Sequence, residues 1–379
     1  MWDVPLFELN FDEQEAQAVQ AVIESRWLTM GEQTQSFESH FGELLGEGTQ
    51  CFAVSSATAA LHMSLLALGV GPGDEVIIPA LTFVADANVV RMVGARPVLA
   101  DSVSLDNWNV SADTVRQKMT SKTRAVIVVH FAGYPCDMHE LVSLCSNQGI
   151  PLIEDVAHAP GASIDGRQCG TFGDTGCFSF FSNKNLSIGE GGMVVCRNPQ
   201  IAKNLSALRS HGMSTLTLDR HKGRANSYDV EQVGLNYRMD EMRASLGKVQ
   251  LAKLAAANEA RGRHVHAYNQ QFVGTSIEVP FRQIPDNVVS AYHIMPVMLP
   301  KGADRPAIMQ RLRDEKIQSS IHYPPFWEFT AYADETRESD APNVSEVASR
   351  ELTLPLYPTM TDEQRTTVVD TLLRAVNDQ

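Results

Sequence analysis

Residues 176–195 read GCFSFFSNKNLSIGEGGMVV. The aromatic front of this stretch predicts a short buried strand, and Met193 to Cys196 predicts a second one. The apolar pattern breaks between them, and Lys184 stands in the break, followed by glycines that permit a tight turn and close approach of the backbone to a ligand. Most loop lysines are solvated surface residues. An enclosed lysine is instead a candidate for a Schiff base, because burial lowers its pKa and frees the amine.

Composition and charge set the broad class of the protein. Its 379 residues suit two domains better than one core, and 44% hydrophobic residues are typical of a globular chain. A net charge of −14 argues against nucleic acid or an anionic membrane as partners. No apolar run approaches the roughly 18 residues that cross a bilayer, and the first residues lack the pattern of a signal peptide. The six cysteines form no C-x-x-C pair and are expected to be free thiols in a reducing cytoplasm.

Strand and helix patterns alternate over the first half of the chain. Strands are predicted at residues 51–54, 75–79, 97–100, 125–129 and 152–153, and helices at 12–25, around 37–45, and at 59–68, 85–92 and 138–146. This alternation predicts an α/β domain with a largely parallel sheet. Helices at 199–208 and 239–261 follow, and then the segment 291–299 and helices at 305–313 and 361–376 predict a smaller α+β unit. The predicted domains are residues 1–254 and 255–379.

The segment Ser55-Ser56-Ala57-Thr58 lies between a predicted strand and the helix that follows it. Free backbone N–H groups and the helix dipole make such a helix start an anion site, and the hydroxyls add donors. Serine and threonine also cap many helices that bind nothing. Taken alone, this segment is better explained as a plain cap.

A second polar position follows the apolar strand 152–153, where Glu154 and Asp155 end the run. Ligands of parallel sheets gather at the carboxyl ends of the strands. Asp155 is therefore placed to pair with a protonated ring nitrogen, such as that of pyridoxal 5′-phosphate, although a loop-start acid can equally cap the next element. Phe83, at the end of a predicted strand, either stacks on such a ring or belongs to the core.

The order of these features along the chain is informative. A phosphate-type turn, a strand-end acid and a loop lysine follow one another as a pyridoxal phosphate site of the aspartate-aminotransferase fold type requires. The 29 residues from Asp155 to Lys184 suffice for a strand, a connection and a second strand, so that both side chains can face one crevice.

Several motifs carry a resemblance to a known family. They are SSATAALH at 55–62, GPGDEVI at 71–77, LTFVA at 81–85, EDVAH at 154–158, SFFSNKN at 179–185, GEGGM at 189–193 and GLNYRM at 234–239. The chain resembles the DegT–StrS family of pyridoxal-phosphate-dependent sugar aminotransferases, from Trp27 to the stretch LPLYP at 354–358. The resemblance implies fold type I, with a large, mostly parallel α/β domain and a smaller C-terminal α+β domain.

The resemblance also implies roles for individual residues. Lys184 would hold the cofactor as a Schiff base and carry a proton between cofactor and substrate, and Asp155 would face the pyridine nitrogen. The other cofactor contacts that it implies are the phosphate-binding residues Ala57, Thr58 and Ser179, the stacking ring of Phe83, and His158 near the cofactor ring. Asn236 would reach the phosphate from the neighbouring subunit, so the resemblance implies a homodimer with shared active sites.

The implied reaction starts with glutamate or glutamine, which loads the cofactor as pyridoxamine 5′-phosphate. The amino group then passes to a keto-sugar, most often a nucleotide-linked one, and a keto-cyclitol is the main variant. Some relatives carry histidine instead of the lysine and perform dehydration, so Lys184 favours transamination. The alternatives are a pyridoxal-phosphate-dependent sugar dehydratase or lyase and a cofactor-binding regulator without turnover.

Four further residues are candidate substrate contacts, namely Arg209, His293, His322 and Tyr323. Both histidines can equally be packed residues of a domain interface. No metal site is expected, because His264 and His266 lie on a polar helix with no third ligand in view.

Overall fold

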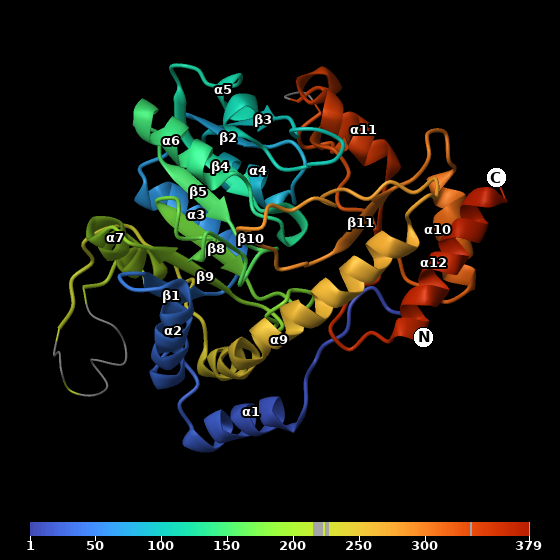
Figure 1. Cartoon of the computed structure of the whole chain (residues 1–379). Helices are drawn as coiled ribbons and strands as arrows, with labels where there is room; N and C mark the ends of the chain where they lie inside the picture. Colours follow the sequence, from blue (N-terminus) through green and yellow to red (C-terminus); the bar gives the residue numbers. More distant parts are fainter. Residues whose placement is uncertain (215–222, 224–226, 334–335, 379) are drawn as a thin grey trace.

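The computed structural model describes residues 1–214, 223, 227–333 and 336–378 (Figure 1). Its centre is a seven-stranded sheet in the order β1-β9-β8-β5-β4-β2-β3. The strands are β1 (Gln50–Val54), β2 (Glu75–Pro79), β3 (Arg96–Ala100), β4 (Thr123–Val129), β5 (Leu152–Asp155), β8 (Thr175–Ser179) and β9 (Gly192–Cys196). Only β9 runs antiparallel to its neighbours, so the predicted α/β class with a largely parallel sheet is confirmed.

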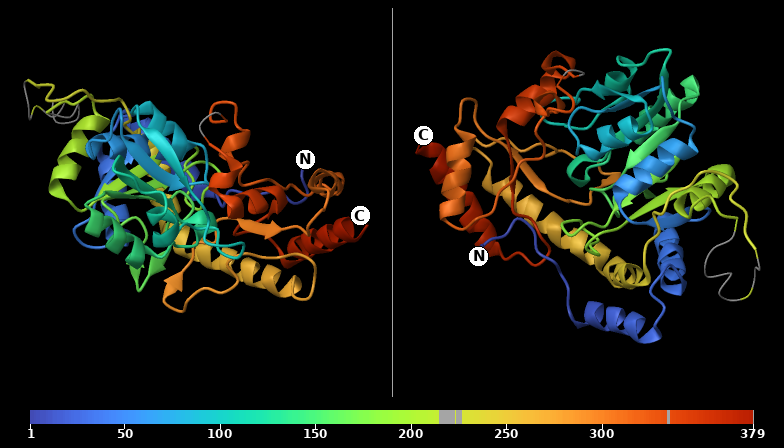
Figure 2. Two further views of the ribbon diagram at one scale, coloured as in Figure 1. Left: turned by 90° about the horizontal axis from the view of Figure 1, so that it is seen from above. Right: turned by 180° about the vertical axis from the view of Figure 1, so that it is seen from behind.

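Helices cover both faces of this sheet (Figures 1 and 2). Strand β4 is buried on both sides, because alternate residues of a strand point to opposite faces of the sheet. Ala125 and Ile127 pack with α3, α4 and α7 on one face. Val126 and Val128 pack with α5 and α6 on the other. On the second face, near β8 and β9, α2 and α9 bury a further apolar cluster. The helices are α2 (Glu32–Leu45), α3 (Ala57–Ala67), α4 (Ala85–Met92), α5 (Ala112–Arg116), α6 (Met138–Gln148), α7 (Pro199–Arg209) and α9 (Glu241–Gln271).

The C-terminal part is smaller and built on a two-stranded antiparallel sheet of β11 (Met295–Met298) and β12 (Glu351–Leu354). Helices α10 (Arg305–Asp314) and α12 (Asp362–Asn377) pack against it and share one apolar core. The sequence did not predict β12, α11 (Pro342–Arg350) or the small sheet of β10 (Val288–Val289), β6 (Ser163–Ile164) and β7 (Arg167–Gln168). Single 3-10 turns lie at Phe131–Gly133, Phe326–Glu328 and Glu338–Asp340.

Helix α9 joins the two parts. Its first half buries Ala244 and Leu254 in the core with α2, and its last turns bury Val265 and Tyr268 in the C-terminal core. The helix was predicted to end near residue 261 and instead ends at Gln271. The predicted boundary between residues 254 and 255 falls inside it and stays a prediction.

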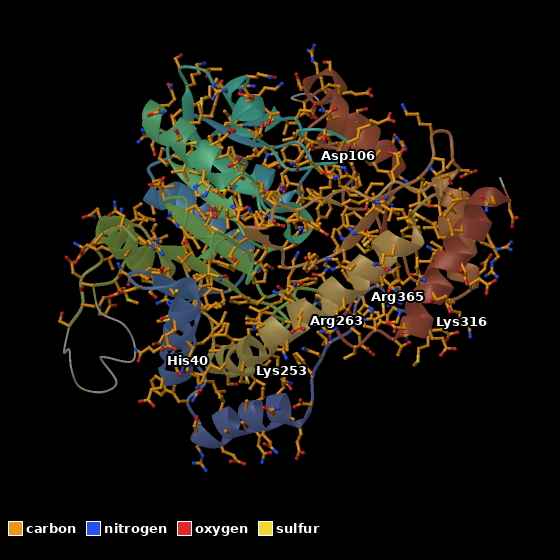
Figure 3. The ribbon with its side chains drawn as sticks, in the orientation of Figure 1. His40, Asp106, Lys253, Arg263, Lys316 and Arg365 are labelled. Atoms are coloured by element: carbon orange, nitrogen blue, oxygen red, sulfur yellow. The ribbon has the colours of Figure 1, made fainter. Side chains whose placement is uncertain are left out.

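The N-terminal segment crosses under α9. Lys253 on α9 binds Glu15 of α1 (Glu13–Ser25) at 2.7 Å and Asp12, the cap of that helix, at 2.9 Å (Figure 3). Asp12 caps α1 together with Glu15 in a capping box, which fits the acidic start read from the sequence.

Two expectations from composition can be compared with the structure. All six cysteines are free, as predicted, and five of them are buried. Across the described ranges, no helix combines the length and the apolar character needed to cross a bilayer.

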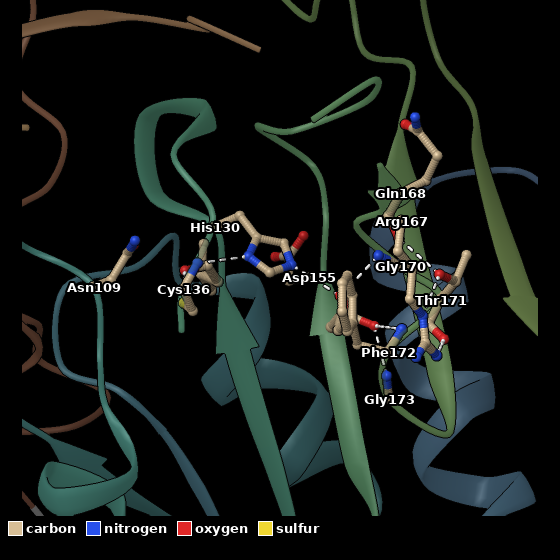
Figure 4. A network of polar contacts seen from close by, with 12 residues as sticks. Asn109, His130, Cys136, Asp155, Arg167, Gln168, Gly170, Thr171, Phe172 and Gly173 are labelled. Atoms are coloured by element: carbon tan, nitrogen blue, oxygen red, sulfur yellow. Dashed lines mark hydrogen bonds and ion pairs between the residues drawn. The ribbon is translucent and has the colours of Figure 1, made fainter. Parts of the chain in front are cut away.

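A buried carboxylate fixes the end of β5. Glu154 is fully buried, and its two oxygens accept the backbone N–H groups of Gly170, Phe172 and Gly173, each at 2.7 Å (Figure 4). The loop after β7 is thereby tied to the strand that carries Asp155.

His130 completes this network from the end of β4. Its Nδ1 accepts the N–H of Cys136 at 3.1 Å and therefore carries no proton, so Nε2 is the ring atom that donates to Glu154 at 3.0 Å. Because every partner of Glu154 is a donor, the carboxylate charge is matched by hydrogen bonds within the fold.

We expect Glu154→Gln to destabilise the protein strongly. The amide would replace one acceptor oxygen with an NH₂ group that faces other donors, leaving buried N–H groups unpaired. The free energy of unfolding should fall by about 3 kcal/mol or more in chemical denaturation at equal cofactor occupancy. Glu140→Gln, at an exposed position of α6, is the matched control and should stay within about 0.5 kcal/mol. Equal stability of the two variants would contradict the structural role of the network.

Candidate active site

A cavity of about 410 Å³ opens at the carboxyl ends of the parallel strands. Val129 ends β4, Asp155 ends β5 and Ser179 ends β8, and all three line it. This is the edge of the sheet at which α/β proteins bind ligands. The predicted site residues that line the cavity are Ala57, Thr58, Phe83, Asp155, His158, Ser179, Lys184, His322 and Tyr323.

Lys184 lies in the connection between β8 and β9 with its side chain partly in the cavity. Burial lowers the pKa of its amine to about 8, and the nearby charge of Asp155 acts in the opposite direction. A substantial fraction of this lysine is thus an unprotonated amine near pH 8, which is the nucleophilic form.

Asp155 is buried at the end of β5, where its Oδ1 accepts the N–H of Ala157 at 2.8 Å. Loss of solvation raises the pKa of this carboxyl, while the backbone hydrogen bond and the charge of Lys184 lower it. A second buried acid, Asp86 on α4, has a pKa raised by burial and by the charge of Asp155, and its Oδ2 accepts the hydroxyl of Thr82 at 2.6 Å. No pattern in the sequence singled out Asp86. A cationic partner for Asp155 would favour its ionised form in these surroundings.

The start of α3 forms another wall of the cavity. Ser56 is the N-cap, and its hydroxyl accepts the N–H of Ala59 at 3.1 Å, so the capping interpretation is correct. The same helix start also lines the cavity through Ser56, Ala57 and Thr58. Strand β9 begins against it with no space between, because a Cβ on Gly192 would lie 2.5 Å from the carbonyl carbon of Ser56.

Three histidines and a tyrosine surround Lys184. The ring of His158 lies 4.4 Å from that of His293, centroid to centroid, and its Nε2 lies 3.1 Å from the hydroxyl of Tyr323. His322 hydrogen-bonds Thr353 on β12 at 2.8 Å. Burial lowers the pKa of His158 and His293 far below the usual value and that of His322 to about 3. All three rings are therefore neutral at physiological pH.

The remaining predicted residues lie outside the cavity lining. Arg209 is buried against β1, where its guanidinium contacts Glu38 and the carbonyl of Ala53. Asn236 is exposed and pairs through its backbone with Ser210. His293 lies behind Lys184, with 3.4 Å between His293 Nε2 and Lys184 Nζ.

The cavity also contains polar residues that the sequence did not single out. Thr82, Asn183 and Glu190 line it, each within or beside a motif noted for other positions. Thr353 and Glu351, which support His322, belong to β12, and no sequence pattern connected that strand with the cavity.

The lining residues fit pyridoxal 5′-phosphate. The N–H groups at the start of α3 and Ser179 suit a phosphate, Asp155 suits a ring nitrogen, and Lys184 suits a carbonyl carbon. Asn183 Oδ1 is buried at this cavity with no hydrogen-bond partner among the described residues, as expected for a side chain that serves a ligand.

Comparison with known proteins identifies the family to which the chain belongs. The model of the DegT/DnrJ/EryC1/StrS aminotransferase family matches residues 10–373. The chain belongs to this family. It is similar to an uncharacterized protein of Methanocaldococcus jannaschii, at 34% identity over 99% of this chain and 98% of that protein.

Solved structures of family members superpose closely. The aminotransferase TlmJ from Streptoalloteichus hindustanus has a TM-score of 0.90 and 34% identity, with 100% of this chain and 99% of that one covered. Spr1654 from Streptococcus pneumoniae, described as a sugar aminotransferase and solved in a pyridoxamine phosphate form, has a TM-score of 0.91 and 29% identity, with 100% and 99% covered. The protein is therefore a pyridoxal-phosphate-dependent aminotransferase of fold type I.

The residues of the cavity can be assigned tasks in such an enzyme. Pyridoxal 5′-phosphate held here would supply an electron sink for the substrate carbon that loses its proton. Lys184 supplies an amine that can hold and return a proton at Nζ, since its lowered pKa lies close to the working range. With the cofactor bound, Asp155 would hold the charge that keeps a ring nitrogen protonated, and the start of α3 would hold the phosphate.

We expect Asp155→Asn to reduce turnover by about 100-fold or more at unchanged cofactor occupancy. The amide keeps the shape and the acceptor oxygen for Ala157 but removes the negative charge, and loss of about two units of ring-nitrogen pKa corresponds to that factor. Steady-state rates normalised to bound cofactor provide the measurement. Asp113→Asn, at an exposed position on α5, serves as the control and should leave turnover unchanged. Near-normal turnover of Asp155→Asn would show that Asp155 is only a structural cap.

Proposed function

We propose that the protein transfers an amino group from glutamate or glutamine to a keto-sugar and that this sugar is nucleotide-linked. The observation that carries this proposal is the lowered pKa of Lys184, which lines the same cavity as Asp155. The chain also belongs to a family of aminotransferases. The similarity to Spr1654, described as a sugar aminotransferase, supports the choice of a sugar.

The lining of the cavity also supports a sugar acceptor. Besides Lys184 and Asp155 it presents side chains that form hydrogen bonds with hydroxyl groups, and the ring of Phe181 at its exposed side suits the apolar face of a sugar. Ring packing and many small polar contacts are what a neutral polyhydroxy ligand needs.

The volume of the cavity limits what it holds. At about 410 Å³ it lies toward the lower end of ligand pockets, which span roughly 300–1,000 Å³. We place the nucleotide of a linked substrate outside this cavity, beyond Phe83, which is 54% exposed.

The alternatives differ in the products they make. A keto-cyclitol acceptor would give an amino-cyclitol, a dehydratase or lyase would eliminate water or a substituent without gaining nitrogen, and a regulator would bind the cofactor without turnover. Lys184 supports transamination, because the dehydrating relatives carry histidine at this position.

The discriminating assay supplies glutamate or glutamine carrying ¹⁵N, on the amino group or the amide, together with a panel of nucleotide-linked keto-sugars and inosose ketones. We expect a product in which a C–NH₂ group replaces the ketone, with the label detected by mass spectrometry. Lys184→Ala should abolish label transfer, and Lys248→Ala, on α9 outside the cavity, should not. Loss of water without label would indicate a dehydratase, and absence of any product across the panel would favour the regulator.

We also propose a homodimer with shared active sites. Asn236 is exposed and outside the cavity of its own chain, so a contact with a phosphate would have to form in a second copy. Among the described residues that line the cavity, Lys184 is the only basic one besides histidine. In our proposal the cation that the carboxylate of glutamate requires comes from the neighbouring subunit.

Mixed dimers test this arrangement. We expect inactive Lys184→Ala and Asn236→Ala subunits, refolded together, to recover roughly a quarter of the wild-type sites, because half of the dimers are mixed and each holds one intact site. Lys184→Ala mixed with Asp155→Asn is the control and should recover nothing, since both residues belong to the same chain's cavity. Full activity of a monomer at assay concentration would overturn the proposal.

A cytoplasmic location completes the proposal. It is supported by the six free thiols, which suit a reducing compartment.

A further inference from the structure

A line of hydrogen bonds reaches Lys184 from helix α9. Asn258 Nδ2 donates to the carbonyl of Pro160 at 2.9 Å, and its Oδ1 accepts from Asn185 Nδ2 at 2.7 Å. Asn185 Nδ2 also donates to the carbonyl of Ala291 at 2.7 Å. Asn185 follows Lys184 directly in the sequence, and both asparagines are buried.

These contacts fix the orientation of both amides. The carbonyl oxygens of Pro160 and Ala291 only accept hydrogen bonds, so each asparagine must turn its NH₂ group toward them. A flipped Asn185 would place its oxygen against the carbonyl oxygen of Ala291. The oxygen of Asn185 consequently faces the ring of His293, where it lies 2.8 Å from Nδ1.

The fixed amide determines the tautomer of His293. Its Nδ1 must carry the proton that Asn185 Oδ1 accepts, and a neutral imidazole has only one. Nε2 therefore presents a lone pair, and this atom lies 3.4 Å from Lys184 Nζ. The ring is 3% exposed, and burial together with the charge of Lys184 lowers the pKa of His293 far below its usual value, which keeps it neutral.

We propose that His293 is the hydrogen-bond acceptor for the protonated amine of Lys184. Asn185 and Asn258 are the positioning residues that hold its ring in the accepting tautomer. Whenever Lys184 holds a proton at Nζ, a charge arises in a cavity whose burial disfavours it, and the lone pair of His293 stabilises and aims that charge. The contacts from Asn258 through Asn185 to His293 act on Lys184 and not on the keto substrate. The proposal therefore does not depend on the proposed sugar.

Other ionisable groups act on the same amine. Asp155 raises the pKa of Lys184 through its negative charge, and Lys184 lowers the pKa of both His158 and His322. Arg261 on α9 donates to the carbonyl of His293 at 3.4 Å. None of these groups is altered in the substitutions below, so their contributions are common to all variants.

The alternative is that His293 only packs against the ring of His158, at 4.4 Å between centroids. His293→Phe separates the two interpretations, because phenyl keeps a planar ring but offers no acceptor. In cofactor-free protein, Lys184 is labelled with formaldehyde and cyanoborohydride at a series of pH values, and its peptide is quantified by mass spectrometry. Only the unprotonated amine reacts, so the midpoint of the pH profile reports the pKa of Lys184.

We expect the midpoint to fall by about one pH unit in His293→Phe. Loss of an acceptor disfavours the ammonium form, so the proton leaves at lower pH, and a hydrogen bond to a charged group has about this strength. His264→Phe is the matched control, since it is another buried histidine whose ring contacts Arg365 away from the cavity, and it should leave the midpoint unchanged. An unchanged or raised midpoint in His293→Phe would overturn the proposal.

Two substitutions of Asn258 test the positioning role even if His293→Phe fails to fold. Asn258→Leu removes one of the two acceptors of the Asn185 amide and leaves it held by the carbonyl of Ala291 alone, so the midpoint should fall in the same direction as in His293→Phe but by less. Asn258→Asp keeps an acceptor oxygen for Asn185, loses the donor to Pro160 and adds a negative charge, so the midpoint should not fall. A merely structural role would leave the midpoint of Asn258→Leu at the wild-type value, and that result would show that Asn258 does not position Asn185 and His293.

Discussion

The site depends on one electrostatic constraint, a carboxylate and an amine that line the same cavity and are both largely shielded from water. Burial alone raises the pKa of Asp155 and lowers that of Lys184, so each group would tend to lose its charge. Each also favours the charged form of the other. The balance leaves the lysine with a pKa of about 8, close enough to neutrality for its amine to hold and release a proton. A more open cavity would lose this tuning, and a site without the acid would shift it further.

The parallel sheet brings Asp155 and Lys184 to the same cavity. Asp155 ends β5 and Ser179 ends β8, two adjacent parallel strands whose carboxyl ends meet at one edge, and Lys184 follows five residues after Ser179. Glu154 holds the β5 end by accepting three backbone N–H groups. Rigid support behind a functional acid keeps its carboxylate in place without help from the ligand.

Much of this could be read from the sequence, for physical reasons. Parallel strands buried on both faces appear as short apolar runs, and polar residues at their ends mark the ligand edge, so Asp155, Lys184 and the start of α3 were predictable. The supports were not. His293 lies 109 residues from Lys184, and Thr353 lies 31 residues from His322, so their contacts arise only from the tertiary fold. The length of α9 was missed because its later turns pack in a different core from its first half.

The three histidines near Lys184 show how the cavity avoids excess positive charge. Each has a ring nitrogen that is engaged by a fixed group: the N–H of Ala132 at His158, the amide of Asn185 at His293 and the hydroxyl of Thr353 at His322. Protonation of any ring would place a second cation beside Lys184, lower the lysine pKa further and compete for the charge of Asp155. Because burial lowers the pKa of all three histidines, they do not act as a pH switch near neutrality. They supply directional neutral donors and acceptors around a single ionisable amine, and the charge balance of the site is left to Lys184 and Asp155.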